Sequence, residues 1–430
     1  MGMDVCMKWN RWYALKSYLS SALWIVPLFA LVAENIVIRL VYALHTWFDW
    51  IPWFGSTLTG AMETLNTVET LTVSFIVFTF GSMLVAIQVA SGQLTPRIIA
   101  TALLRNNVIR LTVGLFTFTM LFAVGTQARI DETVPQFAVA IAWLMGIASI
   151  TAFLFLIDYT ARLLRPVSIV WRIGEQGIRV IESVYPELIQ SSKAPRQHEA
   201  IGPVARIVAH RGISAMVLAA NLKSLASVAE HADGVIEFVP RIGDFVATGD
   251  PLFQLYGRAA SIDDRALLAL VAFGPERTIE QDSTFAFRVI VDIAIKALSP
   301  AINDPTTAVL AIDQLHRLLR QVGRRHLRDE ALYDSSAVLR VVFRTPNWDD
   351  FVQLAVSEIR LYGAGNFQIA RRLRAMMENL EESLSETRRP ALRRELELLD
   401  RTTQRLYQLP EDLALARHAD LQGLGGATER

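Results

Sequence analysis

Long runs of apolar residues occupy the first 160 positions of the chain, and charged residues are concentrated in the remainder. A helix needs about 20 apolar residues to cross ~30 Å of hydrocarbon. Four segments reach that length, at about 18–44, 68–91, 108–128 and 134–159. The pattern predicts a transmembrane domain of four helices over residues 1–160.

The first apolar segment is interrupted in its second half by Glu34, Asn35 and Arg39. A charge near the bilayer centre costs a few kcal/mol, so we expect this half to lie near an interface or against other helices. The alternative is a cleaved signal peptide, because basic residues precede the run and a small-residue site lies near Ala33. Apolar sequence resumes after that site and continues to Leu44, which favours a retained helix.

The basic residues of the short loops predict the orientation of the helices. Lysine and arginine are enriched in cytoplasmic loops, and tryptophan is enriched at the membrane interfaces. Basic residues precede the first apolar segment and follow the fourth, whereas residues 45–67 contain none and carry three tryptophans. This alternation indicates that both termini are cytoplasmic.

The second apolar segment carries a polar stripe. At 100° per residue, one narrow helical face holds Glu63, Thr70, Ser74, Gly81 and Gln88. Small and hydroxyl side chains on one face are typical of close helix–helix packing. The same stripe could line a hydrated pathway, because a buried glutamine amide needs a partner or water. Both interpretations remain open.

The second part of the chain is predicted to be a cytoplasmic α+β region. Residues 161–195 read as a membrane-proximal helix and linker, and residues 196–260 as a β-rich module with Gly-Asp turns at 243–244 and 249–250. The turn spacing resembles half of a biotinyl- or lipoyl-type barrel-sandwich. Such carriers need a lysine at a hairpin tip, and Lys223 lies in a helical pattern instead, so we expect no carrier function.

Residues 261–410 are predicted to be mainly helical, with at least one strand at 338–343. Asp282 or Ser283 can cap a helix over about 284–298. Asp304 followed by proline begins a second helix that ends at Gly323. Helical spacing continues to about 406, either as a short coiled coil or as a docked surface helix. The tail at 411–430 is expected to be disordered.

Arg288, Asp292 and Lys296 are spaced for an i, i+4 ladder on the first of these helices. The corner that follows could hold a ligand or an ion, although its polar residues could equally serve only to cap the backbone. The candidate functional motifs on the cytoplasmic side comprise Ser91, Gln93, Thr95, Pro96, Arg97, Arg277, Gln281, Asp282, Arg288, Asp292, Ser299, Pro300, Asn303 and Asp304.

Composition narrows the possible functions. The 430 residues have a formal net charge of zero. The protein as a whole therefore has no excess positive charge that would attract a nucleic acid. A single cysteine excludes a disulfide framework or a thiolate metal cluster. The seven histidines are scattered, and no phosphate-binding loop or nucleophile elbow is present. We therefore expect no enzymatic activity, no cofactor and no metal.

Three motifs carry a resemblance to a known family. They are the runs at 86–97, 277–305 and 359–365, which occur in the order seen in the bacterial predicted membrane proteins grouped as domain of unknown function 2254. The resemblance covers about residues 15–410 and implies a multi-pass protein of the bacterial inner membrane. It implies no activity.

Two functions fit this organisation. The first is a channel or transport-related protein, gated by its cytoplasmic domain and assembled as a homo-oligomer in the lipid bilayer, because four helices are few for a pathway within one subunit. The alternative is a membrane-anchored sensor or scaffold whose cytoplasmic domain binds a metabolite or a protein partner.

Overall fold

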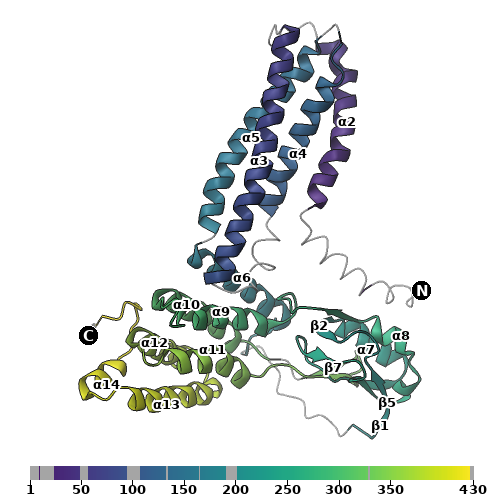
Figure 1. Cartoon of the computed structure of the whole chain (residues 1–430). Coiled ribbons are helices and arrows are strands. Elements are labelled where there is room, and N and C mark those ends of the chain that lie inside the picture. The colour runs from purple at the N-terminus through teal and green to yellow at the C-terminus, as the bar shows by residue number, and fades with distance from the viewer. Residues whose placement is uncertain are drawn as a thin grey trace. The chain divides into compact units, whose positions relative to one another are not determined.

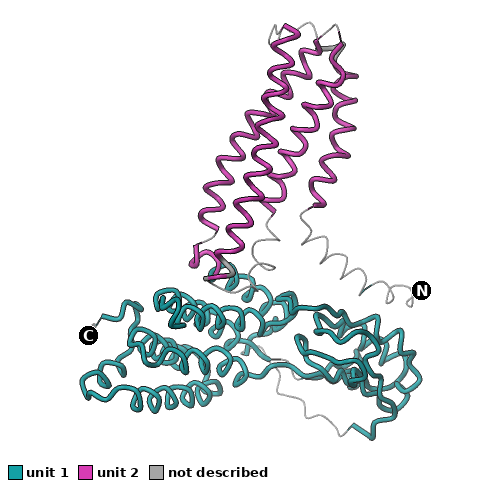
Figure 2. Tube along the Cα trace, viewed as in Figure 1, with its two compact units in different colours: residues 1–17, 93–95, 170–430 teal, residues 18–92, 96–169 magenta. Residues whose placement is uncertain are grey.

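A computed structural model describes residues 9, 24–48, 57–93, 107–131, 134–163, 165–189, 201–327 and 330–426. The chain divides into two compact units (Figure 2). The helical unit comprises residues 18–92 and 96–169, and the C-terminal unit comprises residues 1–17, 93–95 and 170–430.

The helical unit contains α2 (Ile25–Phe48), α3 (Leu58–Gln93), α4 (Asn107–Gln127) and α5 (Gln136–Leu163), labelled in Figure 1. All four are long and apolar enough to cross a membrane by length and composition, which confirms the four apolar helices predicted from sequence. α3 begins ten residues before the predicted segment at 68, so Glu63 of the polar stripe lies within the helix although it precedes that segment.

Small residues allow the helices of this unit to approach closely. A Cβ added at Gly114 of α4 would lie 2.5 Å from Val26 Cγ1 of α2. A Cβ at Gly146 of α5 would lie 2.9 Å from Val68 Cγ2 of α3. α4 also packs against α5. The glycines therefore set the contacts between neighbouring helices.

The strands of the C-terminal unit form two sheets, of order β1-β5-β3-β8-β7 and β4-β2-β6. The β3–β8 pair is parallel and the other pairs are antiparallel. The bounds are β1 (Val204–Ala209), β2 (Ala215–Ala220), β3 (Gly234–Phe238), β4 (Phe245–Val246), β5 (Pro251–Gly257), β6 (Val271–Gly274), β7 (Ala331–Tyr333) and β8 (Leu339–Phe343).

The β module predicted over 196–260 is thus incomplete without later segments of the chain. β6, β7 and β8 all come from beyond residue 260, and β8 pairs with β3 in the middle of the larger sheet. Hydrophobic residues from both sheets, among them Val217, Ile236, Phe253 and Val341, share one core cluster.

The helices of the C-terminal unit are α6 (Pro166–Val184), α7 (Leu222–His231), α8 (Asp264–Leu268), α9 (Ser283–Ala297), α10 (Pro305–Gly323), α11 (Trp348–Gly363), α12 (Phe367–Ser383), α13 (Arg389–Leu406) and α14 (Pro410–Ala416). Short 3-10 turns lie at Arg258–Ser261 and Glu386–Arg388. Two predicted caps are confirmed: Asp282 accepts hydrogen bonds from the Thr284 and Phe285 amides, and Asp304 accepts one from the Thr307 amide.

The C-terminal segment differs from the disordered tail predicted at 411–430. Residues up to 426 are described, and they include α14. Asp420 accepts hydrogen bonds from the amides of Gln422, Gly423 and Gly425. Arg371, which is only 1% exposed, donates to the carbonyls of His418 and Gly425. Hydrogen bonds of Asp420 and Arg371 thus help to fix this segment.

Candidate functional site

The polar stripe of α3 faces outward from the helical unit. Its five residues, Glu63, Thr70, Ser74, Gly81 and Gln88, are all exposed. No atom lies within 4 Å of a Cβ added at Gly81. The buried residues of α3, such as Leu65 and Thr72, lie on its other faces. Packing between the described helices therefore does not explain the stripe, which lies on the outer surface of this unit.

The predicted motif that follows α3 lies outside the residues that the structure describes. This applies to Thr95, Pro96 and Arg97, and to the side chains of Ser91 and Gln93.

The helical unit has a second group of polar residues, which sequence reasoning missed. These interior polar residues are buried on all four helices: Glu34, Thr72, Thr79, Thr112, Thr119, Thr126 and Ser149. The three threonines of α4 recur every seven residues, a spacing that keeps them on one helical face. That repeat is the signal from which they could have been found.

Two hydroxyl groups in this interior lack partners. Thr72 donates to the carbonyl of Val68, and Ser149 donates to the Thr119 hydroxyl over 3.2 Å. The buried hydroxyls of Thr79 and Thr126 have no hydrogen-bond partner among the described residues. Unpaired polar groups are costly away from water, so the interior holds unused hydrogen-bonding capacity.

Glu34 is the charged member of this group. It is 7% exposed, and no hydrogen bond or ion pair to it occurs in the described part of the chain. A Cβ added at Gly125 of α4 would lie 2.8 Å from Glu34 Oε1 and 3.2 Å from Arg129 Nη1. Gly125 therefore makes the space that the carboxyl occupies. Of the two settings predicted for this half of the first apolar segment, near an interface or against other helices, the structure shows packing against α4.

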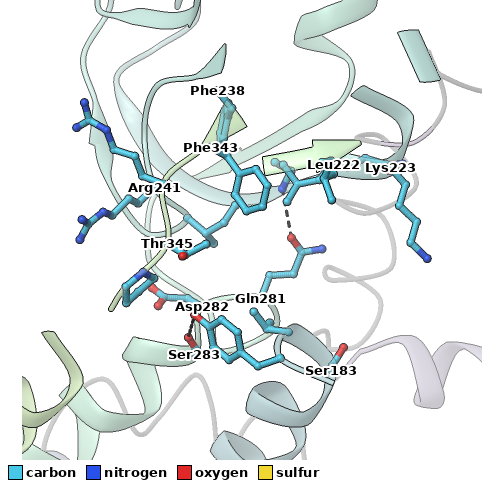
Figure 3. Close-up of a pocket in the computed structure, with 18 of the residues that line it drawn as sticks. Ser183, Leu222, Lys223, Phe238, Arg241, Gln281, Asp282, Ser283, Phe343 and Thr345 are labelled. Atoms are coloured by element: carbon cyan, nitrogen blue, oxygen red, sulfur yellow. Dashed lines mark hydrogen bonds between the residues drawn. The ribbon is translucent and has the colours of Figure 1, made fainter. Parts of the chain in front are cut away.

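The C-terminal unit contains a separate pocket of about 700 Å³ (Figure 3). Its walls come from the end of α6, the β2–α7 junction, the end of β3, the start of α9 and the end of β8. Ligand sites commonly have volumes of about 300–1,000 Å³. The volume of this pocket falls within that range.

Gln281 and Ser283 connect the walls of the pocket (Figure 3). Gln281 Oε1 accepts a hydrogen bond of 3.2 Å from the Ala220 amide at the end of β2. The Tyr185 hydroxyl, just after α6, lies 3.4 Å from the Ser283 hydroxyl at the start of α9. These contacts tie a β-strand and two helices to one short segment.

Asp282 and Arg277 lie together behind this wall. Asp282 is 4% exposed, and its Oδ2 lies 3.1 Å from Arg277 Nε. Burial raises the pKa of Asp282, while Arg277 and the hydrogen bonds from Thr284 act in the opposite direction. Gly243, with φ of +93°, packs directly on the pair, where a side chain would collide with both groups. Arg277, Gln281 and Asp282 therefore form one structural group.

The remaining predicted residues lie elsewhere in the unit. Arg288 donates to Asp292 on its own helix and to Glu358 of α11, and these hydrogen bonds raise the pKa of Arg288 and lower that of Glu358. Ser299, Pro300, Asn303 and Asp304 form the corner between α9 and α10, where Asn303 has φ of +49°. None of these residues lines the pocket.

The described residues contain no group of three or more His, Cys, Asp or Glu side chains arranged to hold a metal ion. The pocket lining does contain cations. Lys223 and Arg344 are exposed and make no ion pair within the described ranges, whereas Arg241 lies 3.3 Å from Asp350. Sequence reasoning did not find these residues, because they are brought together from three distant segments.

A family model for predicted membrane proteins, DUF2254, matches residues 20–379. The chain belongs to the DUF2254 family. Uncharacterized proteins of Mycobacterium tuberculosis and Mycobacterium bovis are each 25% identical to it over 428 residues, covering 94% of this chain and 81% of the relative. No solved structure matches this DUF2254 protein.

Proposed function

We propose that this DUF2254 protein conducts protons or small cations across the bacterial inner membrane as a homo-oligomer, and that its C-terminal unit, on the cytoplasmic side, regulates it. The observation that carries the proposal is Glu34, a nearly buried carboxyl that has no hydrogen-bond or ion-pair partner among the described residues. An ionisable side chain within apolar helices is costly and commonly marks an ion or proton route.

The surroundings of Glu34 support the same function. A carboxylate removed from water is stabilised by a bound cation, which supplies the opposite charge. The unpaired hydroxyls of Thr79 and Thr126 supply further polar groups inside the unit. The α3 stripe adds a polar surface on the outside, and in lipid its Gln88 would be stabilised by a second copy.

The proposal is tested by ion flux in liposomes containing the purified oligomer. We expect proton or monovalent cation flux that Glu34→Gln reduces at least tenfold. Asp158→Asn is the matched control, because Asp158 is an exposed carboxylate of α5. A folded oligomer without flux under a pH gradient, a cation gradient or a membrane potential would contradict the proposal.

A second candidate function is that of a membrane-anchored sensor or scaffold, and the pocket favours it. α6 begins at Pro166, shortly after α5 ends at Leu163, and Ser183 at its other end lines the pocket. A ligand in the pocket would contact α6, the helix that follows the last apolar segment. A stoichiometric partner co-purified from native membranes, together with absence of flux, would favour this function over transport.

A further inference from the structure

We infer that the pocket of the C-terminal unit is a binding site for a small organic anion, whose carboxylate or phosphate group is attracted by the unpaired cations Lys223 and Arg344 and whose apolar body lies along Leu222 and Phe343. The proposal goes beyond ion conduction, because it assigns a ligand site to a unit whose role is otherwise only regulatory.

The charge of the lining is the first argument. The basic residues of the lining are Lys223, Arg241, Arg344 and His326, of which the lysine and the arginines are cations, and the acidic ones are Glu187 and Asp282. Asp282 is already paired with Arg277, which is outside the lining. Glu187 is therefore the single acidic group among the described lining residues that is left to oppose two cations without ion pairs. The unsatisfied charge of the pocket is positive, which attracts an anion.

The hydrogen-bonding capacity of Gln281 is the second argument. A backbone N–H can only donate, so the contact with the Ala220 amide requires the carboxamide oxygen of Gln281 on that side. The NH2 group is then left to donate, and it has no partner among the described residues. Figure 3 shows Gln281 between Lys223 and Arg241, which lie on opposite sides of the pocket. The free groups of Gln281, Lys223 and Arg344 are donors, which favours a ligand that supplies acceptors.

The rigidity of the back wall is the third argument. The Arg277–Asp282 pair, the Tyr185–Ser283 contact and the packing of Gly243 fix the segment that carries Gln281. A donor held in place before binding loses little entropy when the ligand arrives. The apolar side chains of Leu222, Phe238 and Phe343 complete the wall and suit a ligand with an apolar or planar body.

The test is calorimetric titration of the full-length protein in detergent with paired probes that differ in one charged group. The pairs are adenosine monophosphate against adenosine, and benzoate against benzamide; inorganic phosphate alone is the fifth probe. We expect at least one organic anion to bind at least about tenfold more tightly than its neutral partner, in line with a charge-assisted hydrogen bond. Binding of phosphate alone would contradict a site for an organic anion.

Substitutions of the lining residues test whether the anion binds in this pocket. Lys223→Glu combined with Arg344→Glu is expected to weaken anion binding at least tenfold, and Gln281→Glu, which keeps the size and the acceptor for Ala220, is expected to do the same. Lys223→Arg should retain binding. Arg401→Glu on exposed α13 is the control and should not change it. Equal binding of charged and neutral probes, no binding of any probe, or an unchanged affinity in both charge variants would overturn the inference.

These results are separate from the flux experiments. Glu34→Gln is expected to bind the anion as wild type does, because Glu34 belongs to the helical unit. If no anion binds, the proposal of ion conduction is unaffected. If no ions are conducted, the proposal of an anion-binding site is unaffected.

Discussion

The two units differ in whether their buried charged side chains have partners. In the C-terminal unit, buried Arg340 pairs with Asp334, buried Arg374 pairs with Asp400, and buried Glu395 accepts a hydrogen bond from Ser357. In the helical unit, buried Glu34 has no partner among the described residues. Paired charges hold a structure together, whereas an unpaired one is a cost to stability that function can explain.

Breaking a paired charge should have the largest effect on stability. Glu395 also lies 3.4 Å from Arg360, which is only 11% exposed in its side chain. Glu395→Leu would leave that guanidinium without its carboxylate, so we expect the C-terminal unit to lose about 3 kcal/mol. Denaturant unfolding followed by circular dichroism measures this loss. The control is Glu397→Leu on the exposed face of the same helix, and an equal loss there would remove the distinction.

A pH effect of similar size follows from His316. Burial and the neighbouring Arg320 lower the pKa of His316 to about 4, while Asn379 Oδ1, which accepts a hydrogen bond from His316 Nε2, acts in the opposite direction. The unfolded chain therefore binds the proton more readily, and stability should fall as pH decreases from about 6.5 to about 4, by about 2–3 kcal/mol. His316→Gln should flatten this part of the profile. An unchanged profile would mean that another group dominates.

Removing the carboxyl of Glu34, which has no partner among the described residues, should increase stability rather than decrease it. Glu34→Leu is expected to stabilise the helical unit by about 1–3 kcal/mol, because it removes a buried polar group without breaking any pair. Resistance to unfolding in mixed micelles measures the change. Marked destabilisation would show that Glu34 has a structural partner and would weaken the contrast between the units.

Two glycines of the helical unit should show the smallest effects. Gly125→Ala is expected to destabilise by about 1–2 kcal/mol, since the added methyl would crowd Ile38 and Glu34. Gly81→Ala meets open space and should stabilise the helix by about 0.5–1 kcal/mol. The same unfolding assay measures both. Effects of equal sign would contradict the assignment of an inner and an outer face.

Local features of the fold could be predicted from the sequence, because they depend on neighbouring residues. Asp304 caps the helix predicted for it, and Asp282 is the cap of the other helix, for which the sequence offered Asp282 or Ser283. The environment of a helical face could not be predicted. The helical spacing of 100° per residue placed Ser74 and Gln88 on one face of α3, and both are exposed in the structure. No local pattern shows that this face lies on the surface of the helical unit, whereas Thr119 of α4 lies in its interior.

The pocket illustrates the same limit. Gln281 was singled out from its motif, but its neighbours come from positions as far apart as Ser183 and Thr345. The sequence drew attention to Lys223 only because it does not fit the position of a biotin- or lipoate-carrying lysine. Arg344 directly follows a predicted strand and belongs to no motif. Their proximity depends on β8 pairing with β3 in parallel, a long-range contact that no local pattern encodes.

The most direct test of the proposed function compares wild type and Glu34→Gln in liposomes under an imposed pH gradient and membrane potential. We predict measurable flux for wild type, at least a tenfold loss for Glu34→Gln, and normal flux for Asp158→Asn at equal protein content. Equal flux for wild type and Glu34→Gln would contradict the role of the buried carboxyl.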